Sequence, residues 1–149
     1  MLQLLGEYEC RLDEKGRLKL PAPLIKQLAD KQLRNFVLNR GFEPCLMLYP
    51  EPTWQQISQE INQLNQYSKQ NRDFIRYFYR GASPVEADAM DRILVNKRLL
   101  EYAEIQKDLV LFAYDSKIEI WAKEKYEKLL NQEPSDFSDL AELVLGKNK

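Results

Sequence analysis

The 149-residue chain contains no histidine. Histidine is the commonest general base and the commonest metal ligand, so its absence excludes imidazole-based catalytic triads and most zinc sites. A glycine-rich phosphate loop, a metal-ligand cluster and a nucleophile motif are missing as well. The two cysteines, Cys10 and Cys45, fit no zinc spacing, and we expect small buried apolar residues rather than a disulfide. The sequence therefore predicts no enzyme, no metal and no cofactor.

Long apolar runs are also missing. None approaches the roughly 20 residues needed to span a membrane, and the first residues carry no basic segment typical of a signal peptide. We therefore expect a cytoplasmic protein without a membrane or a small-molecule substrate as partner. The formal net charge is −1, whereas nucleic-acid-binding domains are often strongly basic. Any binding to DNA would have to depend on a local cationic surface.

An internal repeat is the most informative feature that is present. A shift of 75 residues superposes one Asp-x-x-x-Arg motif on another and then aligns apolar positions with apolar positions. The aligned pairs are Asp13 with Asp88, Arg17 with Arg92, Leu18 with Ile93, Leu20 with Val95 and Leu24 with Leu99. Further on, residues 35–38 match 108–111 and residues 45–49 match 117–121, as expected if the second copy has shorter loops.

Each copy has the pattern strand, turn, strand, short helix, strand, loop, strand, helix. Residues 17–20 alternate charged and apolar side chains, which is typical of a half-buried strand. Gly16 can supply a positive φ to the preceding turn, and Pro21 ends the strand because it cannot donate to a ladder. The prediction is an α+β fold with pseudo-two-fold symmetry. It divides into a first repeat (residues 5–55), a helical connection (56–82), a second repeat (83–129) and a C-terminal helical tail (130–149).

Two helices are expected in the connection. One opens at Pro52 with Thr53 as its N-cap, and the other runs over residues 71–81 with Gly81 as its C-cap. The second helix carries four aromatic side chains that could stack on bases, but their helical spacing favours a core or a subunit interface. They are Phe74, Tyr77, Phe78 and Tyr79.

Four cations gather within nine residues around the first turn: Arg11, Lys15, Arg17 and Lys19. They could contact phosphates or a groove of DNA, or they could form a solvated strand face on which Asp13 pairs with Arg17. From these residues alone both interpretations stay open. We expect Asp13 and Asp88 to cap turn amides and to orient the arginines rather than to catalyse a reaction.

Several motifs resemble those of the MraZ family. The first is the run of residues 6–9 followed by 12–21, the second is Leu46–Pro50 leading to Trp54, and the third is the link at residues 74–82. The second Asp-x-x-x-Arg copy and residues 118–121 complete the pattern. The likeness covers about residues 3 to 130.

This resemblance implies a bacterial, sequence-specific DNA-binding transcriptional regulator. Such proteins act, as repressors, on promoter repeats of the division and cell-wall gene cluster. Each repeat is similar to half of an AbrB swapped-hairpin dimer, so the implied fold is a tandem swapped-hairpin β-barrel with flanking helices. Chains of the family assemble into closed rings. The implied partners are double-stranded DNA and further copies of the chain, and the implied location is the nucleoid.

The resemblance also assigns DNA contact to the basic hairpin. We expect Lys15 and Arg17 to contribute most, with Gly16 shaping the turn and with Arg11 and Lys19 secondary. Arg92 is expected to contribute less, because the second copy departs from the family pattern around it. The departures are Ala89-Met90 in the turn, Asp91 in place of glycine and Asn96 in place of Pro21.

Two other functions remain alternatives. An AbrB-type antitoxin would bind DNA and also a toxin through its tail, although such proteins are usually short single repeats. An enzyme based on carboxylates is disfavoured by the motifs that are missing.

Overall fold

The secondary structure repeats along the chain in the order that the sequence predicts. The computed structural model describes residues 2–29, 31–131 and 137–146. The first repeat contains β1 (Leu4–Arg11), β2 (Arg17–Lys19), α1 (Ala22–Ala29), β3 (Asn35–Arg40) and β4 (Leu46–Pro50). A helical hairpin follows, made of α2 (Glu51–Asn62) and α3 (Lys69–Tyr79). The second repeat contains β5 (Ser83–Glu86), β6 (Arg92–Leu94), α4 (Lys97–Ala103), β7 (Asp108–Asp115) and β8 (Lys117–Ala122). The second repeat ends with α5 (Lys123–Asn131), and the tail contains α6 (Phe137–Gly146).

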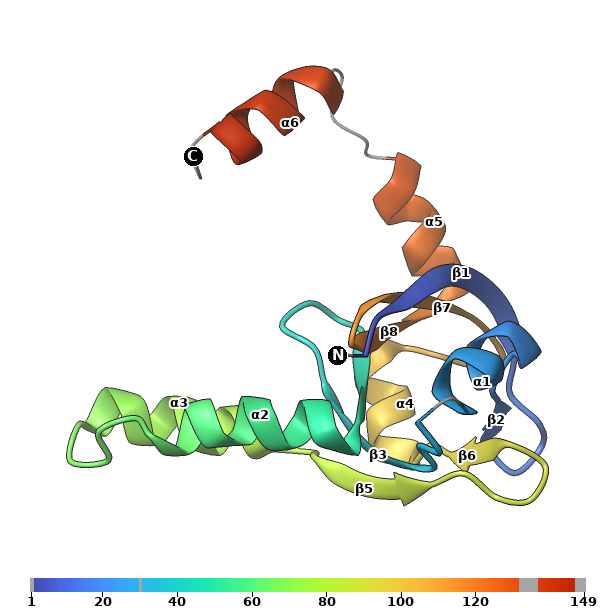
Figure 1. The fold of residues 1–149 in the computed structure, drawn as a ribbon, viewed down its shortest axis with the longest axis horizontal. Helices are drawn as coiled ribbons and strands as arrows, with labels where there is room; N and C mark the ends of the chain where they lie inside the picture. The colour runs from blue at the N-terminus through green and yellow to red at the C-terminus, as the bar shows by residue number, and fades with distance from the viewer. Residues whose placement is uncertain (1, 30, 132–136, 147–149) are drawn as a thin grey trace.

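The two repeats exchange strands. One antiparallel sheet has the order β1-β7-β8-β4-β3-β5, so the first strand of each repeat pairs with a strand of the other repeat. The short strands β2 and β6 pair with each other in a separate two-stranded ribbon. Figure 1 shows this ribbon at one end of the β-structure, on the side away from α5. Since the strands interleave, the repeats form one folded unit.

A pseudo-two-fold axis relates the repeats. Leu18 lies opposite Ile93 at the centre of the β2–β6 ribbon, and Met47 lies opposite Glu119 at the centre of the β4–β8 pair. Both pairs join residues that the sequence repeat aligns. Leu18 and Ile93 are each 0% exposed, so these two aligned residues occupy equivalent environments. The predicted α+β fold with pseudo-two-fold symmetry is confirmed.

One part of the expected architecture needs correction, because the sheet does not close into a barrel. Within the described residues, β1 and β5 remain the two edges of the six-stranded sheet. The ribbon meets these edge strands at the turns, through the Leu12–Leu18 bridge and through the backbone hydrogen bonds from Asp13 to Arg17 and from Asp88 to Arg92. Its strands β2 and β6 have only three residues each, and both belong to a separate two-stranded sheet. Pro21 and Asn96 follow closely, and the amide of Pro21 cannot donate to a ladder while the Asn96 side chain caps α4.

The core fills the space enclosed by the sheet, the ribbon and the helices α1 and α4. Its fully buried side chains come from both repeats, and the two short helices contribute matching apolar faces. From α1 these are Leu24 and Leu28, and from α4 they are Leu99 and Ala103. The amphipathic spacing of both helices therefore buries one face of each helix in the common core.

The helical hairpin α2–α3 projects away from the β-structure (Figure 1). The rings of Trp54 and Phe78 stack with centroids 5.8 Å apart, which joins the two helices. The expected N-cap was wrong: α2 begins at Glu51 after Pro50, and buried Thr53 instead donates its hydroxyl to the Ser116 carbonyl at 2.9 Å. Three aromatic residues of α3 pack among themselves and on Trp54, namely Phe74, Phe78 and Tyr79. Tyr77 is 61% exposed and lies against the Arg40 guanidinium instead. No residue of α3 is buried, so the expected core position is wrong and a subunit interface stays a prediction.

The remaining expectations on local structure are largely met. Gly81 follows α3 with a φ of 91°, in the left-handed region where helices often end. Cys10 and Cys45 are free thiols, and burial raises the pKa of Cys45 to about 12. Within the described chain, no helix has the length and apolarity to cross a membrane. The tail is helical in α5 and α6, and the rest of residues 130–149 lies outside the described residues.

Leu18 and Ile93, which face each other at the pseudo-two-fold axis, give a stability prediction. Leu18→Ala and Ile93→Ala should each lower the free energy of unfolding by about 2–5 kcal/mol, because each leaves a cavity at a fully buried site. Leu94→Ala, in the same strand as Ile93 but 58% exposed, should change it by less than about 0.5 kcal/mol. Chemical denaturation of the three variants measures this. A loss confined to Leu18→Ala would contradict the equivalence of the two positions.

Candidate nucleic-acid interface

The turn before β2 is built around the carboxylate of Asp13. Its Oδ1 accepts hydrogen bonds from the backbone amides of Lys15 and Arg17, both at 2.9 Å. Its Oδ2 accepts a hydrogen bond from Nε of Arg17 at 2.6 Å. Asp13 is the residue type that favours such a turn, because its short side chain reaches amides two and four residues ahead. The carboxylate therefore fixes the backbone of the turn and the direction of the arginine together.

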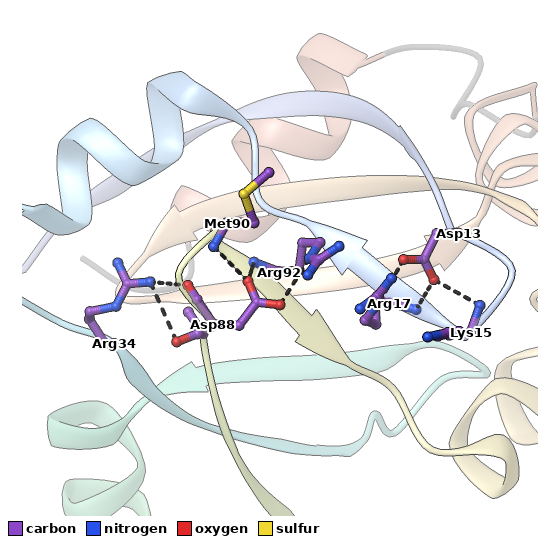
Figure 2. A network of polar contacts seen from close by, with 8 residues as sticks. Asp13, Lys15, Arg17, Arg34, Asp88, Met90 and Arg92 are labelled. Atoms are coloured by element: carbon purple, nitrogen blue, oxygen red, sulfur yellow. Dashed lines mark hydrogen bonds and ion pairs between the residues drawn. The ribbon is translucent and has the colours of Figure 1, made fainter.

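The turn before β6 repeats this geometry. Oδ1 of Asp88 accepts the backbone amides of Met90 and Arg92 at 2.9 Å, and Oδ2 accepts the Nε of Arg92 at 2.9 Å. Figure 2 shows the two turns at opposite ends of the ribbon, each with its arginine bound to its own aspartate. The structural role expected for Asp13 and Asp88 is confirmed, and so is the pairing of Asp13 with Arg17.

These hydrogen bonds hold the pKa of both aspartates below the ordinary value. For Asp13 the main cause is the backbone amide of Arg17, with smaller contributions from its guanidinium and from the Lys15 amide. For Asp88 the main cause is the backbone amide of Arg92, followed by the Arg92 guanidinium and the Met90 amide. Both carboxylates are thus ionised at neutral pH and keep their arginines in place.

The two turns differ in how they reach the left-handed backbone conformation that precedes each strand. Gly16 has a φ of 78° and meets no steric penalty there. Asp91 has a φ of 62°, a conformation that aspartate tolerates better than most residues. Its carboxylate accepts Nη1 of Arg34 at 3.0 Å, and Arg34 also donates to the carbonyls of Ala87 and Asp88. Asp91 thus pairs with Arg34 rather than with Arg92. The smaller contribution of Arg92 to DNA binding stays a prediction.

The outward face of the ribbon collects side chains from both repeats. Leu18 and Ile93 point inward, so their neighbours along each strand point outward. The register places Lys19 opposite Arg92 and Arg17 opposite Leu94. Three of these four outward side chains are cationic. Instead of two separate basic hairpins, the fold therefore forms one composite cationic ribbon.

Both arginines offer the same part of the guanidinium to a ligand. Their side chains are each 29% exposed, and the recorded carboxylate contact is made through Nε in both. Within the described residues, no protein group is bonded to their terminal Nη atoms, the pair that forms bidentate contacts with guanine O6 and N7 or with a phosphate. The aspartates thus orient two guanidinium groups without occupying their binding edges.

The other predicted cations fall into two groups. Lys15 at the turn and Lys19 on the ribbon are exposed, and among the described residues neither ammonium group forms an ion pair with a carboxylate. Arg11 lies on β1 outside the ribbon, and its Nε is 3.2 Å from Asp108. Lys15, Gly16, Arg17, Lys19 and Arg92 are thus brought together, and Arg11 stands apart.

Sequence reasoning missed two further cations and the apolar part of the ribbon. Val95 donates its amide to the Gly16 carbonyl, so the exposed residues Lys97 and Arg98 at the start of α4 follow close to the first turn. Leu94 and Met90 are exposed beside the arginines. The alternation along β6 could have indicated an outward Leu94, but only the pairing of β6 with β2 reveals its cationic neighbours. No cluster of three metal-ligating carboxylates or thiols forms among the residues described.

Two interleaved repeats that meet in a cationic two-stranded ribbon define a swapped-hairpin β-ribbon protein. Comparison with known proteins identifies the family. The family model described as "MraZ protein, putative antitoxin-like" matches residues 3–77 and again residues 78–147.

Curated proteins that resemble the chain carry the name transcriptional regulator MraZ. The one from Christiangramia forsetii is 44% identical over 149 residues, which cover 99% of this chain and 96% of the relative. The one from Flavobacterium psychrophilum is 46% identical over 147 residues, covering 98% and 94%. The one from Pelotomaculum thermopropionicum is 36% identical over 144 residues, covering 97% of each. The chain belongs to the MraZ family.

The aspartate turns give a prediction on pH. Their lowered pKa means that the stabilising hydrogen bonds are fully present above the ordinary pKa of aspartate and are lost as the pH falls through the folded-state pKa. Arg17→Gln should raise the pKa of Asp13 only in part, because the backbone amide of residue 17 remains. Carboxyl chemical shifts in an NMR titration measure this, with Asp88 as the internal control that Arg17→Gln should leave unchanged. An Asp13 that titrates at its ordinary value in the unmodified chain would contradict the geometry.

Proposed function

We propose that this chain is a DNA-binding transcriptional regulator that inserts the β2–β6 ribbon into the major groove. The observation that carries the proposal is the pair of arginines on one ribbon, each held through Nε by an aspartate. The major groove admits a two-stranded ribbon, and bidentate contact of arginine with guanine is its commonest specific contact. The names of the curated relatives support regulation of transcription.

The exposed lysines suit a second kind of contact. Lys15 and Lys19 flank the arginines, and the exposed Lys97 and Arg98 follow Val95, whose amide donates to the Gly16 carbonyl. In the proposal these four cations reach the phosphates that border the groove. Contacts with phosphates position a protein on DNA, whereas contacts with base edges supply sequence preference. The proposal therefore assigns affinity mainly to the lysines and preference mainly to Arg17 and Arg92.

The resemblance to the family extends the proposal to a target and a location. The chain would bind promoter repeats of the division and cell-wall gene cluster, repress transcription there and associate with the nucleoid in the cytoplasm. One chain offers one ribbon, and its formal net charge is −1, so a single ribbon would bind weakly. Several ribbons on one assembly would bind repeated sites at high effective concentration.

A closed homo-oligomeric ring would supply this multivalency. Apolar side chains that the chain does not bury itself lie along the helical hairpin and along the tail helices. On the hairpin these are Leu64, Tyr67, Phe74 and Tyr77, and on α5 and α6 they are Leu129, Leu130, Phe137, Leu140, Leu143, Val144 and Leu145. A head-to-tail interface that closes leaves no free edge, so growth stops at a fixed number of subunits.

An AbrB-type antitoxin is the second candidate function. The family description includes antitoxin-like proteins, and α6 exposes an apolar face that a protein partner could cover. An antitoxin would use the same ribbon on DNA, so it differs in having a further partner. The carboxylate-based enzyme considered from the sequence is set aside, because the curated relatives are named as regulators.

The ribbon geometry predicts equal roles for the two arginines. Arg17→Ala and Arg92→Ala should each weaken DNA binding by about 5- to 150-fold per engaged ribbon, the range expected for one bidentate base contact. Fluorescence anisotropy on promoter DNA with tandem repeats measures this, with the salt concentration titrated. Lys128→Ala, which removes one exposed cation from α5 far from the ribbon, is the control and should bind normally. A much smaller loss from Arg92→Ala would restore the first repeat as the dominant DNA contact.

The assembly prediction is a single closed oligomer at micromolar concentration. Sedimentation and native mass spectrometry should give one stoichiometry that Arg17→Ala and Arg92→Ala leave unchanged, because the ribbon is not expected in the subunit interface. A monomer, or a series of lengths without a limit, would contradict the ring.

A further inference from the structure

The outward face of the β2–β6 ribbon contains two exposed apolar side chains among its cations. Leu94 lies directly opposite Arg17 and is 58% exposed. Met90 lies in the turn before Arg92 and is 56% exposed, and the chain repeat aligns it with Lys15. In Figure 2 the Met90 side chain extends from the end of the ribbon beside Arg92. Each end of the ribbon thus presents one oriented arginine, one lysine and one apolar group.

The fold itself does not need these two side chains to be apolar. The neighbours that fill the core at this point are Leu18 and Ile93, which point to the opposite side of the ribbon. The residues that the repeat aligns with Leu94 and Met90 are Lys19 and Lys15, so the same backbone positions accommodate polar side chains equally well. An apolar group in such a place gains free energy only when a ligand covers it.

The charges around these side chains decide what kind of ligand can cover them. A protein surface packed on Leu94 or Met90 would also have to cover Lys19 and the Nη edges of Arg17 and Arg92 that their aspartates leave open. Burying such cationic groups without acceptors costs several kcal/mol. The major groove of DNA meets both needs, because it presents acceptor groups and phosphates together with one apolar group, the 5-methyl of thymine.

We propose that Leu94 and Met90 contact thymine 5-methyl groups in the major groove, next to the bases that Arg17 and Arg92 contact. This inference rests on the proposed DNA binding and adds a base preference to it. Cross-strand neighbours such as Arg17 and Leu94 have Cβ atoms about 4.5–5.5 Å apart, which lies between one and two steps of the roughly 3.4 Å rise between base pairs. A thymine should therefore lie one or two steps from the guanine that Arg17 contacts. Met90 precedes Arg92 by two residues, so its thymine should lie at the other end of the site.

Replacement of thymine by deoxyuridine tests the proposal, because it removes only the 5-methyl group. A duplex is first selected by the full-length chain from a library with a random core, and each thymine of that duplex is then replaced singly. At the thymines contacted by Leu94 and Met90 the affinity should fall about fourfold per methyl group lost. Replacements elsewhere in the duplex should have no effect.

A double-mutant cycle assigns each thymine to its side chain. In Leu94→Ala one of the sensitive positions should become indifferent to deoxyuridine, while the second position should remain sensitive. Met90→Ala should show the reverse, and Leu94→Met should keep the sensitivity. Leu5→Ala is the matched control, since Leu5 is 74% exposed on β1 away from the ribbon and should leave both positions sensitive.

Three results would overturn the inference while leaving DNA binding intact. They are a selected duplex without thymine in its selected core, equal affinity for the thymine and deoxyuridine forms, and a sensitivity to deoxyuridine that persists at both positions in both alanine variants. Failure to select any duplex would instead overturn the proposed function, and the inference with it.

Discussion

The pairing of β2 with β6 across the pseudo-two-fold axis is the interaction on which the rest of the structure depends. Two strands of three residues are too short to be stable alone. They are held by the burial of Leu18 against Ile93 and by matching hydrogen bonds beyond each end, from Leu20 to the Asp91 carbonyl and from Val95 to the Gly16 carbonyl. Because the ribbon joins the repeats, the cationic surface exists only when both repeats are folded together.

A second constraint explains how a chain with a net charge of −1 offers a cationic surface. Both aspartates of the turns bind the arginine through Nε and bind backbone amides through the other oxygen. Each carboxylate charge is therefore neutralised by hydrogen bonds within its own turn, and the carboxylate does not cover the Nη edge of the arginine. The acidic Asp91 is likewise neutralised by Arg34. What matters for an anionic ligand is the direction in which the charges face, not their sum.

Much of the fold could be predicted from the sequence, because the chain contains two copies of one pattern of turns and apolar positions. The alignment of Leu18 with Ile93 predicted the pseudo-symmetry, and the Asp-x-x-x-Arg spacing predicted the turns. Local signals failed where tertiary packing decided the outcome: Thr53 is the residue type of an N-cap, yet the helix begins two residues earlier and Thr53 bonds Ser116. The register that brings Lys19 beside Arg92 could not be predicted either. It joins strands far apart in the chain, and it depends on how the inward residues of both strands fill one core.

The pseudo-symmetry also determines which positions were free to differ. Inward positions of the ribbon are apolar in both copies, since a polar group there would be buried without a partner. Outward positions carry no such constraint. One of them holds arginine in both copies, and at the other the copies diverge, with Lys19 in one and Leu94 in the other. The antiparallel pairing then places each divergent residue beside the arginine of the opposite repeat. Two copies of one motif thus form a surface whose two ends have the same backbone and different chemistry, which is what recognition of an asymmetric DNA sequence requires.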